Sequence, residues 1–292
     1  MLPPGRRTSA IIAPRMSERP VEPGRVGIDA GASLWKLALV REDLELELLP
    51  AGAIEELRQR IGGLSPEEVD QVSLTGGGAA RITAALDGVR FRQVDEFTAW
   101  ARGAQTLAGR AGWTLPRHYL LVSLGTGTSI LEIDGERFQR IGGTALGGGT
   151  LLGLARLLCR AESFAEAAAL ASRGQRGRVD LLVRDVYPAG DIALPPDLTA
   201  ANFAKLGSTE PADLAHALMG LLGENVGILC TAVAHARSIE TVVFGGSALE
   251  ANPTLQEILR LTVQMGGREA WLLPDGAFCG AVGAASIGDS LT

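Results

Sequence analysis

The chain has 292 residues, of which 46% are hydrophobic and 21% are charged, and its net charge is −6. This length and composition can bury a sizeable core, either as one large domain or as two lobes. The sequence has no uninterrupted apolar run near the roughly 18–20 residues of a membrane span, and no basic stripe interleaved with aromatic residues. We therefore expect a protein that neither spans a membrane nor binds nucleic acid.

The first 25 residues differ from the rest because they are rich in Pro and Arg. Their only apolar patch, Ala10–Ala13, is too short for the apolar region of a signal peptide. We expect residues 1–25 to form a disordered extension. A true start at Met16 and an organellar targeting segment are the alternatives. The folded part is expected to begin near Arg25.

From there, strand and helix patterns alternate, which predicts an α/β protein. The predicted elements, in chain order, are strands at Val26–Ile28 and Trp35–Val40, a helix at Glu55–Ile61, a strand at Gln71–Thr75, a helix at Glu96–Ala108, a hairpin at Leu120–Ile133, a strand at Arg137–Ile141, helices at Leu151–Cys159 and Leu214–His235, a strand at Thr241–Phe244, and helices at Thr254–Leu261 and Gly276–Ile287.

Two segments repeat one pattern of strand, Gly-rich turn and strand: Val26–Val40 and Leu120–Ile133. Such a turn lets backbone N–H groups approach a phosphate closely, because Gly has no Cβ. Two hairpins that face each other would grip a nucleoside triphosphate from both sides. We therefore predict a two-lobed enzyme that handles phosphate.

The first turn carries a carboxylate and a cation. Asp29 ends the first strand, where a carboxylate can hold a hydrated Mg²⁺ through water. Lys36 can neutralise the β- and γ-phosphates as a compact charge. An ordinary turn-forming role is the alternative for Asp29.

Three further Gly-rich segments suit a nucleotide. Gly125–Ser129 offers hydroxyl and N–H groups to phosphate oxygens, although a simple hairpin turn has the same appearance. Gly147–Thr150 leads into a helix whose first N–H groups attract an anion. Gly245–Ser247 follows a strand and lets a flat adenine lie near the backbone, with a tight strand-to-helix turn as the alternative.

An acidic pair and one arginine are the candidates for chemistry on an acceptor. Phosphoryl transfer needs a base for the acceptor hydroxyl and cations for the developing charge. Glu96, which follows Asp95 at a helix start, is the candidate base, and Arg140 is the candidate substrate clamp. Acidic residues favour the first turn of any helix, and exposed arginines are commonly only solvated, so these simpler roles stay open.

The three cysteines, Cys159, Cys230 and Cys279, are far apart and set among apolar residues. Without a CxxC pair or a His/Cys cluster, neither a disulfide framework nor a structural zinc site is indicated. We expect buried thiols in a reducing cytoplasm.

Together these motifs resemble those of the ASKHA superfamily of acetate and sugar kinases, hsp70 and actin. The chain is more closely similar to the type II pantothenate kinases, bacterial relatives of the eukaryotic Fumble-type enzymes, from Val26 to Ile287. The strings that carry this likeness are VDEF at Val94–Phe97, GTGTS at Gly125–Ser129, RIGGTALGGGTLLGL at Arg140–Leu154, DLLVRDVY at Asp180–Tyr187, PPDLTAANFAKL at Pro195–Leu206 and DGAFCGAVGA at Asp275–Ala284.

The resemblance implies ATP-dependent phosphorylation of pantothenate to 4′-phosphopantothenate, the first step of coenzyme A biosynthesis. It implies a two-lobed, duplicated ribonuclease-H-like α/β fold, with lobes over 26–118 and 119–292, a homodimer, and coenzyme A or an acyl-CoA as a regulator. Glu96 would be the general base, and Arg140 would bind pantothenate. ATP, with Mg²⁺, would be held by Asp29, Ala30, Gly31, Ala32, Ser33, Leu34, Trp35, Lys36, Thr126, Gly148, Gly149, Thr150, Leu151, Leu152, Phe164 and Gly246.

The chain departs from the family pattern at three places. Ala32-Ser33 stands where the family usually has Gly-Thr, Phe164 stands where a Tyr is possible, and Thr144–Leu146 replaces a frequent small residue. Three alternatives to the leading function remain. The first is a kinase of the same fold for a sugar-like hydroxyl compound, and the second a non-catalytic sensor of nucleotide or acyl-CoA. The third is an ATP-driven activator with an iron–sulfur cluster, which the isolated cysteines do not favour.

Overall fold

The computed structural model describes residues 24–41, 43–65, 72–188 and 194–287. The predicted N-terminal extension lies, over residues 1–23, outside the described residues. The strands are β1 (Arg25–Ala30), β2 (Leu34–Val40), β3 (Leu44–Pro50), β4 (Val72–Thr75), β5 (Arg92–Gln93), β6 (His118–Leu124), β7 (Thr128–Asp134), β8 (Arg137–Thr144), β9 (Leu181–Leu182), β10 (Thr199–Ala201), β11 (Thr241–Gly245) and β12 (Glu269–Leu272). The α-helices are α1 (Ile54–Gly62), α3 (Ala79–Ala85), α4 (Glu96–Arg110), α5 (Gly148–Cys159), α6 (Phe164–Ala171), α7 (Val183–Val186), α8 (Pro211–Ala236), α9 (Pro253–Met265) and α10 (Cys279–Ser286).

Two five-stranded sheets share one topology. The first has the order β3-β2-β1-β4-β5, and the second, counted from its β8 edge, has the order β8-β7-β6-β11-β12. In each sheet three consecutive strands are antiparallel, and the last two run parallel to the first of these. The α/β class is therefore confirmed, and the two halves of the chain repeat one strand arrangement.

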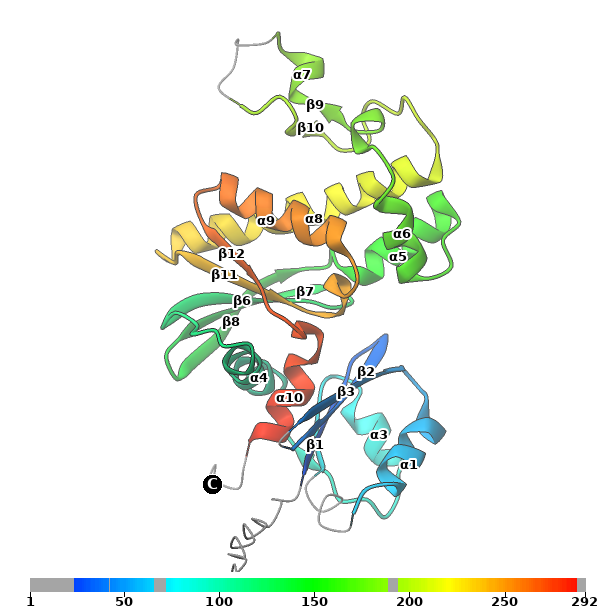
Figure 1. Cartoon of the computed structure of the whole chain (residues 1–292), viewed down its shortest axis with the longest axis vertical. Coiled ribbons are helices and arrows are strands. Elements are labelled where there is room, and N and C mark those ends of the chain that lie inside the picture. The colour runs from blue at the N-terminus through cyan, green and yellow to red at the C-terminus, as the bar shows by residue number, and fades with distance from the viewer. Residues whose placement is uncertain (1–23, 42, 66–71, 189–193, 288–292) are drawn as a thin grey trace, which may run out of the picture.

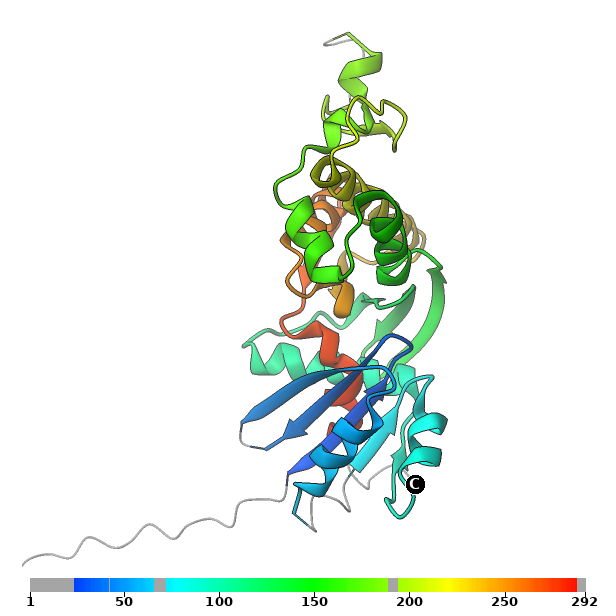
Figure 2. The same cartoon turned by 90° about the vertical axis from the view of Figure 1, so that its right-hand side faces the viewer.

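The central strands β1, β4, β6 and β11 are buried along most of their length because both of their faces are covered. The outer face of the first sheet packs on α1 and α3 around Ile28, Trp35 and Leu57. The outer face of the second sheet packs on α5, α6, α8 and α9 around Leu120 and Phe244. Helices α4 and α10 lie between the two sheets, so the molecule is built of alternating helix and sheet layers (Figures 1 and 2). We call the first sheet with α1 and α3 the first lobe, and the second sheet with its outer helices the second lobe.

The last helix, α10, returns from the second sheet to pack on β1 and α4 of the preceding half (Figure 1). It approaches α4 very closely, since a Cβ at Gly103 would lie 1.8 Å from the Cys279 carbonyl oxygen and one at Gly283 would lie 1.8 Å from that of Ala99. The small residues of this segment are therefore required by packing. The α-helix starts at Cys279, later than predicted, because Gly276–Phe278 forms a 3-10 turn.

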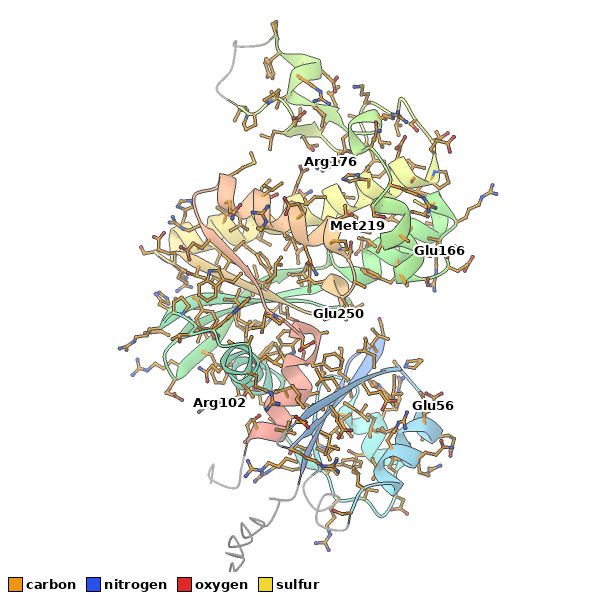
Figure 3. All side chains as sticks on the ribbon, in the orientation of Figure 1. Glu56, Arg102, Glu166, Arg176, Met219 and Glu250 are labelled. Atoms are coloured by element: carbon orange, nitrogen blue, oxygen red, sulfur yellow. The ribbon has the colours of Figure 1, made fainter. Side chains whose placement is uncertain are left out.

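Helix α8 is the core helix of the second lobe. Its length and apolar composition would suffice to cross a membrane, but 67% of its most apolar window is buried inside the protein. Strands β9 and β10 and helix α7 form an extension beyond it (Figure 1). Arg176, at the base of this extension (Figure 3), forms an ion pair of 2.6 Å with Glu224 of α8, whose carboxylate also accepts a hydrogen bond from Thr199.

Candidate active site

A cleft of about 430 Å³ lies where the turns of the two predicted hairpins meet. Both turns line it, together with the start of α4, part of β8 and the segment that follows β11. The predicted site residues that line the cleft are Asp29, Gly31, Ala32, Ser33, Leu34, Lys36, Glu96, Thr126, Arg140 and Gly246. The structure thus brings together most of the residues that the sequence singled out.

The two Gly-rich turns face each other, as the repeated pattern predicts. The hydroxyl groups of Ser33 and Thr126, 93 residues apart in the chain, are hydrogen-bonded at 2.9 Å. Small hydroxyl side chains of the two turns therefore meet in the cleft, where they can donate to phosphate oxygens.

Asp29 and Lys36 form a buried ion pair beneath the first turn. They lie opposite each other on β1 and β2, with 3.5 Å between Asp29 Oδ2 and Lys36 Nζ. Burial raises the pKa of the Asp29 carboxyl above its ordinary value, and the charge of Lys36 opposes this rise. A cation and a carboxylate are thus held ready at one end of the cleft.

Two glycines from distant segments make room for the Asp29 carboxylate. A Cβ at Gly76, after β4, would lie 2.6 Å from Oδ1, and a Cβ at Gly280, in α10, would lie 2.7 Å from Oδ2. Gly76 also has a φ of +90°, which L side chains rarely adopt. The sequence analysis did not single out Gly280, although it lies in the DGAFCGAVGA string.

Glu96 is the first residue of α4 and also lines the cleft. Asp95 caps this helix, since its Oδ1 accepts hydrogen bonds of 2.8 Å from the N–H and the hydroxyl of Thr98. Partial desolvation raises the pKa of Glu96; the charges of Asp29 and Asp95 add to the rise and that of Lys36 opposes it. A carboxylate with a raised pKa is a better general base near neutral pH.

Arg140 lies on β8 beside a bulge. Ile130 pairs with Gly142 and Leu131 pairs with Arg140, so Ile141 is the extra residue of the bulged strand. Among the residues that the structure describes, no carboxylate pairs with Arg140. Its guanidinium is therefore available to an anionic group in the cleft.

Helix α5 supports the second turn from behind. It starts at Gly148, three residues earlier than predicted, because the N–H groups of Gly148 and Gly149 donate to the carbonyl oxygens of Gly125 and Thr126 at 2.8 and 3.0 Å. In this arrangement those two N–H groups hold the turn. Phe164 lies beside the same helix end, 3.7 Å from where a Cβ of Gly148 would be.

The remaining residues that were predicted to bind the nucleotide lie in the core or on α5. Ala30, Trp35 and Leu151 are core residues with at most 3% of their surface exposed. Thr150 donates its hydroxyl to the Ala145 carbonyl oxygen, and Leu152 is half-buried on α5. The residues of α5 and Phe164 do not line the cleft itself.

The backbone conformation at position 246 requires a glycine. Its φ is +118°, and a Cβ there would lie 2.3 Å from the Leu124 carbonyl oxygen. The strand-to-helix turn therefore packs directly on the end of β6, which leaves the cleft open beside it.

Sequence reasoning missed Trp100, which also lines the cleft. It follows Glu96 by four residues on α4, so the two side chains share one face of the helix. This spacing of four residues from Glu96 is the signal in the sequence that could have identified Trp100.

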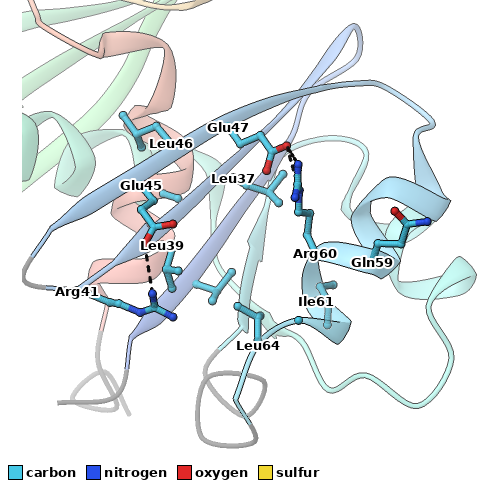
Figure 4. Close-up of a pocket in the computed structure, with 13 residues that line it drawn as sticks. Leu37, Leu39, Arg41, Glu45, Leu46, Glu47, Gln59, Arg60, Ile61 and Leu64 are labelled. Atoms are coloured by element: carbon cyan, nitrogen blue, oxygen red, sulfur yellow. Dashed lines mark hydrogen bonds and ion pairs between the residues drawn. The ribbon is translucent and has the colours of Figure 1, made fainter. Parts of the chain in front are cut away.

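A second cavity, of about 520 Å³, lies on the first lobe between β2, β3 and α1 (Figure 4). Its charged residues are already paired, as Arg41 with Glu45 at 3.2 Å and Arg60 with Glu47 at 2.6 Å. No predicted site residue lines it. Its size alone does not make it the active site.

The cleft fits a magnesium nucleotide. It combines two turns without bulky side chains, a buried ammonium and a carboxylate. The Thr75 hydroxyl, on the strand position paired with Asp29, is buried without a hydrogen-bond partner. Over the described ranges, no three His, Cys, Asp or Glu side chains form a metal cluster, but a hydrated Mg²⁺ on phosphates needs few protein ligands.

Comparisons with known proteins agree with this geometry. The sequence profile of the Fumble family matches residues 51–286. The type II pantothenate kinase of Oceanobacillus iheyensis is 34% identical over 264 residues, which cover 89% of this chain and 98% of that protein. The type II pantothenate kinase of Staphylococcus aureus strain MRSA252 is 30% identical over 269 residues, with coverages of 90% and 99%.

Two solved structures share the fold. The activator of the 2-hydroxyisocaproyl-CoA dehydratase from Clostridium difficile with bound ADPNP has a TM-score of 0.60 and 16% identity, covering 90% of this chain and 92% of that one. The ROK family glucokinase from Streptomyces griseus in complex with glucose and AMPPNP has a TM-score of 0.56 and 15% identity, with coverages of 90% and 98%. These likenesses confirm the predicted two-lobed ASKHA architecture.

Proposed function

Since the chain belongs to the Fumble family, we propose that it transfers the γ-phosphoryl group of ATP to pantothenate and so begins coenzyme A synthesis. The observation that carries the proposal is the cleft, in which a raised-pKa carboxylate, an unpaired arginine and two phosphate-type turns line one space. The names of relatives that span nearly the whole chain support pantothenate as the acceptor.

In the proposed mechanism one group of cleft residues binds ATP and another acts on pantothenate. Lys36 and the N–H groups of the two turns bind the phosphates of ATP. Glu96 accepts the proton of the primary hydroxyl of pantothenate as that oxygen attacks the γ-phosphorus in line. Arg140 binds the anionic acceptor and orients it. Mg²⁺, when bound near Asp29, would neutralise charge on the phosphates.

The proposal extends to the nucleotide residues behind the second turn. Gly148–Leu152 and Phe164 would shape the adenosine end of the site, which their place behind the turn and beside the Gly246 segment supports. The division of the chain at 26–118 and 119–292 is kept as part of the proposal, although α10, from the second of these segments, packs on β1 of the first.

We also propose a homodimer in the cytoplasm. Exposed apolar side chains on the α7 extension and on α8 support a contact between subunits, namely Val186, Tyr187, Leu206 and Ile228. Three buried, unpaired cysteines support a reducing compartment. Coenzyme A or an acyl-CoA would regulate the enzyme at the cleft, because coenzyme A contains both a pantothenate-derived part and an adenine nucleotide.

The direct test incubates the purified full chain with ATP, Mg²⁺ and pantothenate and measures ADP and phosphopantothenate together. A panel of hexoses tests the sugar-kinase alternative. In Glu96→Gln we expect turnover to fall at least 10²-fold while ATP binding by calorimetry is retained, since a general base contributes about 10²–10⁴-fold. Equal turnover in wild type and variant would remove Glu96 from its role.

A further inference from the structure

Trp100 occupies a position beside the proposed general base. It follows Glu96 by one turn of α4, and side chains at this spacing have Cβ atoms about 5–6 Å apart. Trp100 is 5% exposed and belongs to the core between α4 and the second sheet. Trp100 also lines the cleft. The indole thus offers a fixed apolar edge next to the Glu96 carboxylate.

Most of the other residues that line the cleft are polar or glycine, and Leu34 is a second large apolar one. Ser129 and Arg140 come from β7 and β8, and Thr144 ends β8. Trp100 is the one aromatic side chain among the described residues that line the cleft, and a large apolar side chain among polar ones favours an acceptor with an apolar group at one defined place. The indole N–H of Trp100 has no hydrogen-bond partner among the described residues, so it can also donate to an acceptor oxygen.

The chemistry of pantothenate matches this wall. Its reacting primary hydroxyl is attached to a carbon next to a quaternary carbon with two methyl groups. When Glu96 accepts the hydroxyl proton, these methyls lie within a few bonds of the carboxylate. The side chain of Trp100, one helical turn after Glu96 on α4, covers this region.

We propose that Trp100 is a specificity-determining residue that contacts the geminal methyl groups of the acceptor. This inference rests on the proposed function. Arg140 attracts the anionic group, whereas Trp100 distinguishes pantothenate from hydroxyl compounds that lack the branched carbon. Burial of one methyl group in an apolar pocket typically changes kcat/KM by about 10–200-fold.

The test compares two acceptors in the wild-type protein and in three variants of the full chain. The acceptors are pantothenate and its analogue with hydrogen in place of both methyl groups, and kcat/KM is measured for each. Trp100→Leu removes the flat ring but keeps the core apolar, and Trp100→Phe keeps a smaller ring. Trp113→Leu is the matched control, because Trp113 packs edge-on against Trp271 at 5.7 Å, outside the cleft.

We expect wild type and Trp113→Leu to prefer pantothenate by the same factor. In Trp100→Leu this preference should fall at least about 10-fold, mostly through loss on pantothenate, with an unchanged KM for ATP. Trp100→Phe should lie between them, and it provides the test if the Leu variant does not fold. Equal losses on both acceptors would overturn the role of Trp100. A wild-type enzyme that phosphorylates neither acceptor would instead overturn the proposed function.

Discussion

A methyl group at position 280 would collide with the Asp29 carboxylate. In Gly280→Ala the new Cβ would lie 2.7 Å from Oδ2 and 2.8 Å from Cγ of Asp29. Ordinary contact starts near 3.4 Å, so the carboxylate must move by roughly 0.7 Å. The atom that must move, Oδ2, is also the one that contacts Lys36 Nζ. The shift therefore also disturbs the 3.5 Å contact with Lys36.

The size of the effect follows from this displacement. A misplacement of about 1 Å in a catalytic site can reduce the rate about 10²-fold. We expect kcat/KM for ATP to fall about 10–100-fold, which corresponds to about 1.4–2.7 kcal/mol of transition-state stabilisation. The Mg²⁺ concentration for half-maximal rate should rise. Thermal stability should change little, because Ala favours a helix over Gly by about 1 kcal/mol, which offsets part of the crowding.

The assay couples ADP release to a spectroscopic readout across a Mg²⁺ titration, with thermal unfolding measured on the same samples. Gly109→Ala in α4 is the control, since nothing lies within 4 Å of its new Cβ, and its kinetics should equal those of wild type. If Gly280→Ala melts like wild type and keeps its full kcat/KM, the reasoning about the Asp29 position is refuted.

Three other substitutions test the proposed general base Glu96, the proposed substrate-binding residue Arg140 and the extension beyond α8. Asp95→Asn keeps a good helix cap but removes a charge that raises the pKa of Glu96. The substitution should therefore lower the pKa of Glu96. Since Glu96 acts in its deprotonated form, the pH at which kcat/KM falls on the acidic side should be lower than in wild type. An unchanged or higher value of this pH would contradict the prediction. Arg140→Met should raise KM for pantothenate at least about 10-fold and leave KM for ATP nearly unchanged, so equal changes in the two KM values would argue against a clamp. Arg176→Met leaves Glu224 buried without its partner and should cost about 3 kcal/mol in urea unfolding, whereas a loss below about 1 kcal/mol would show that the pair contributes little.

Local patterns predicted the parts of the fold that depend on neighbouring residues. Both hairpins and the start of α4 were found where predicted, because a Gly-rich turn and an aspartate cap act within a few residues. Strands β3, β5, β9, β10 and β12 and helices α3, α6 and α7 were missed. The limits of α5 were wrong at its start, since the contact of its glycines with the second turn is tertiary.

The sequence by itself determined the chemical types in the site: a carboxylate and a cation around the first turn, hydroxyls on the second, and an acid at a helix start. Only the tertiary structure decided which of them meet. Asp29, Glu96 and Gly280 are distant in the chain, and they converge because α10 returns from the second sheet to pack on β1 and α4. Such proximity is set by how sheets and helices pack together, which no periodicity along one segment encodes. For the same reason the role of Trp100 was missed, since only the structure shows that it both belongs to the core and lines the cleft.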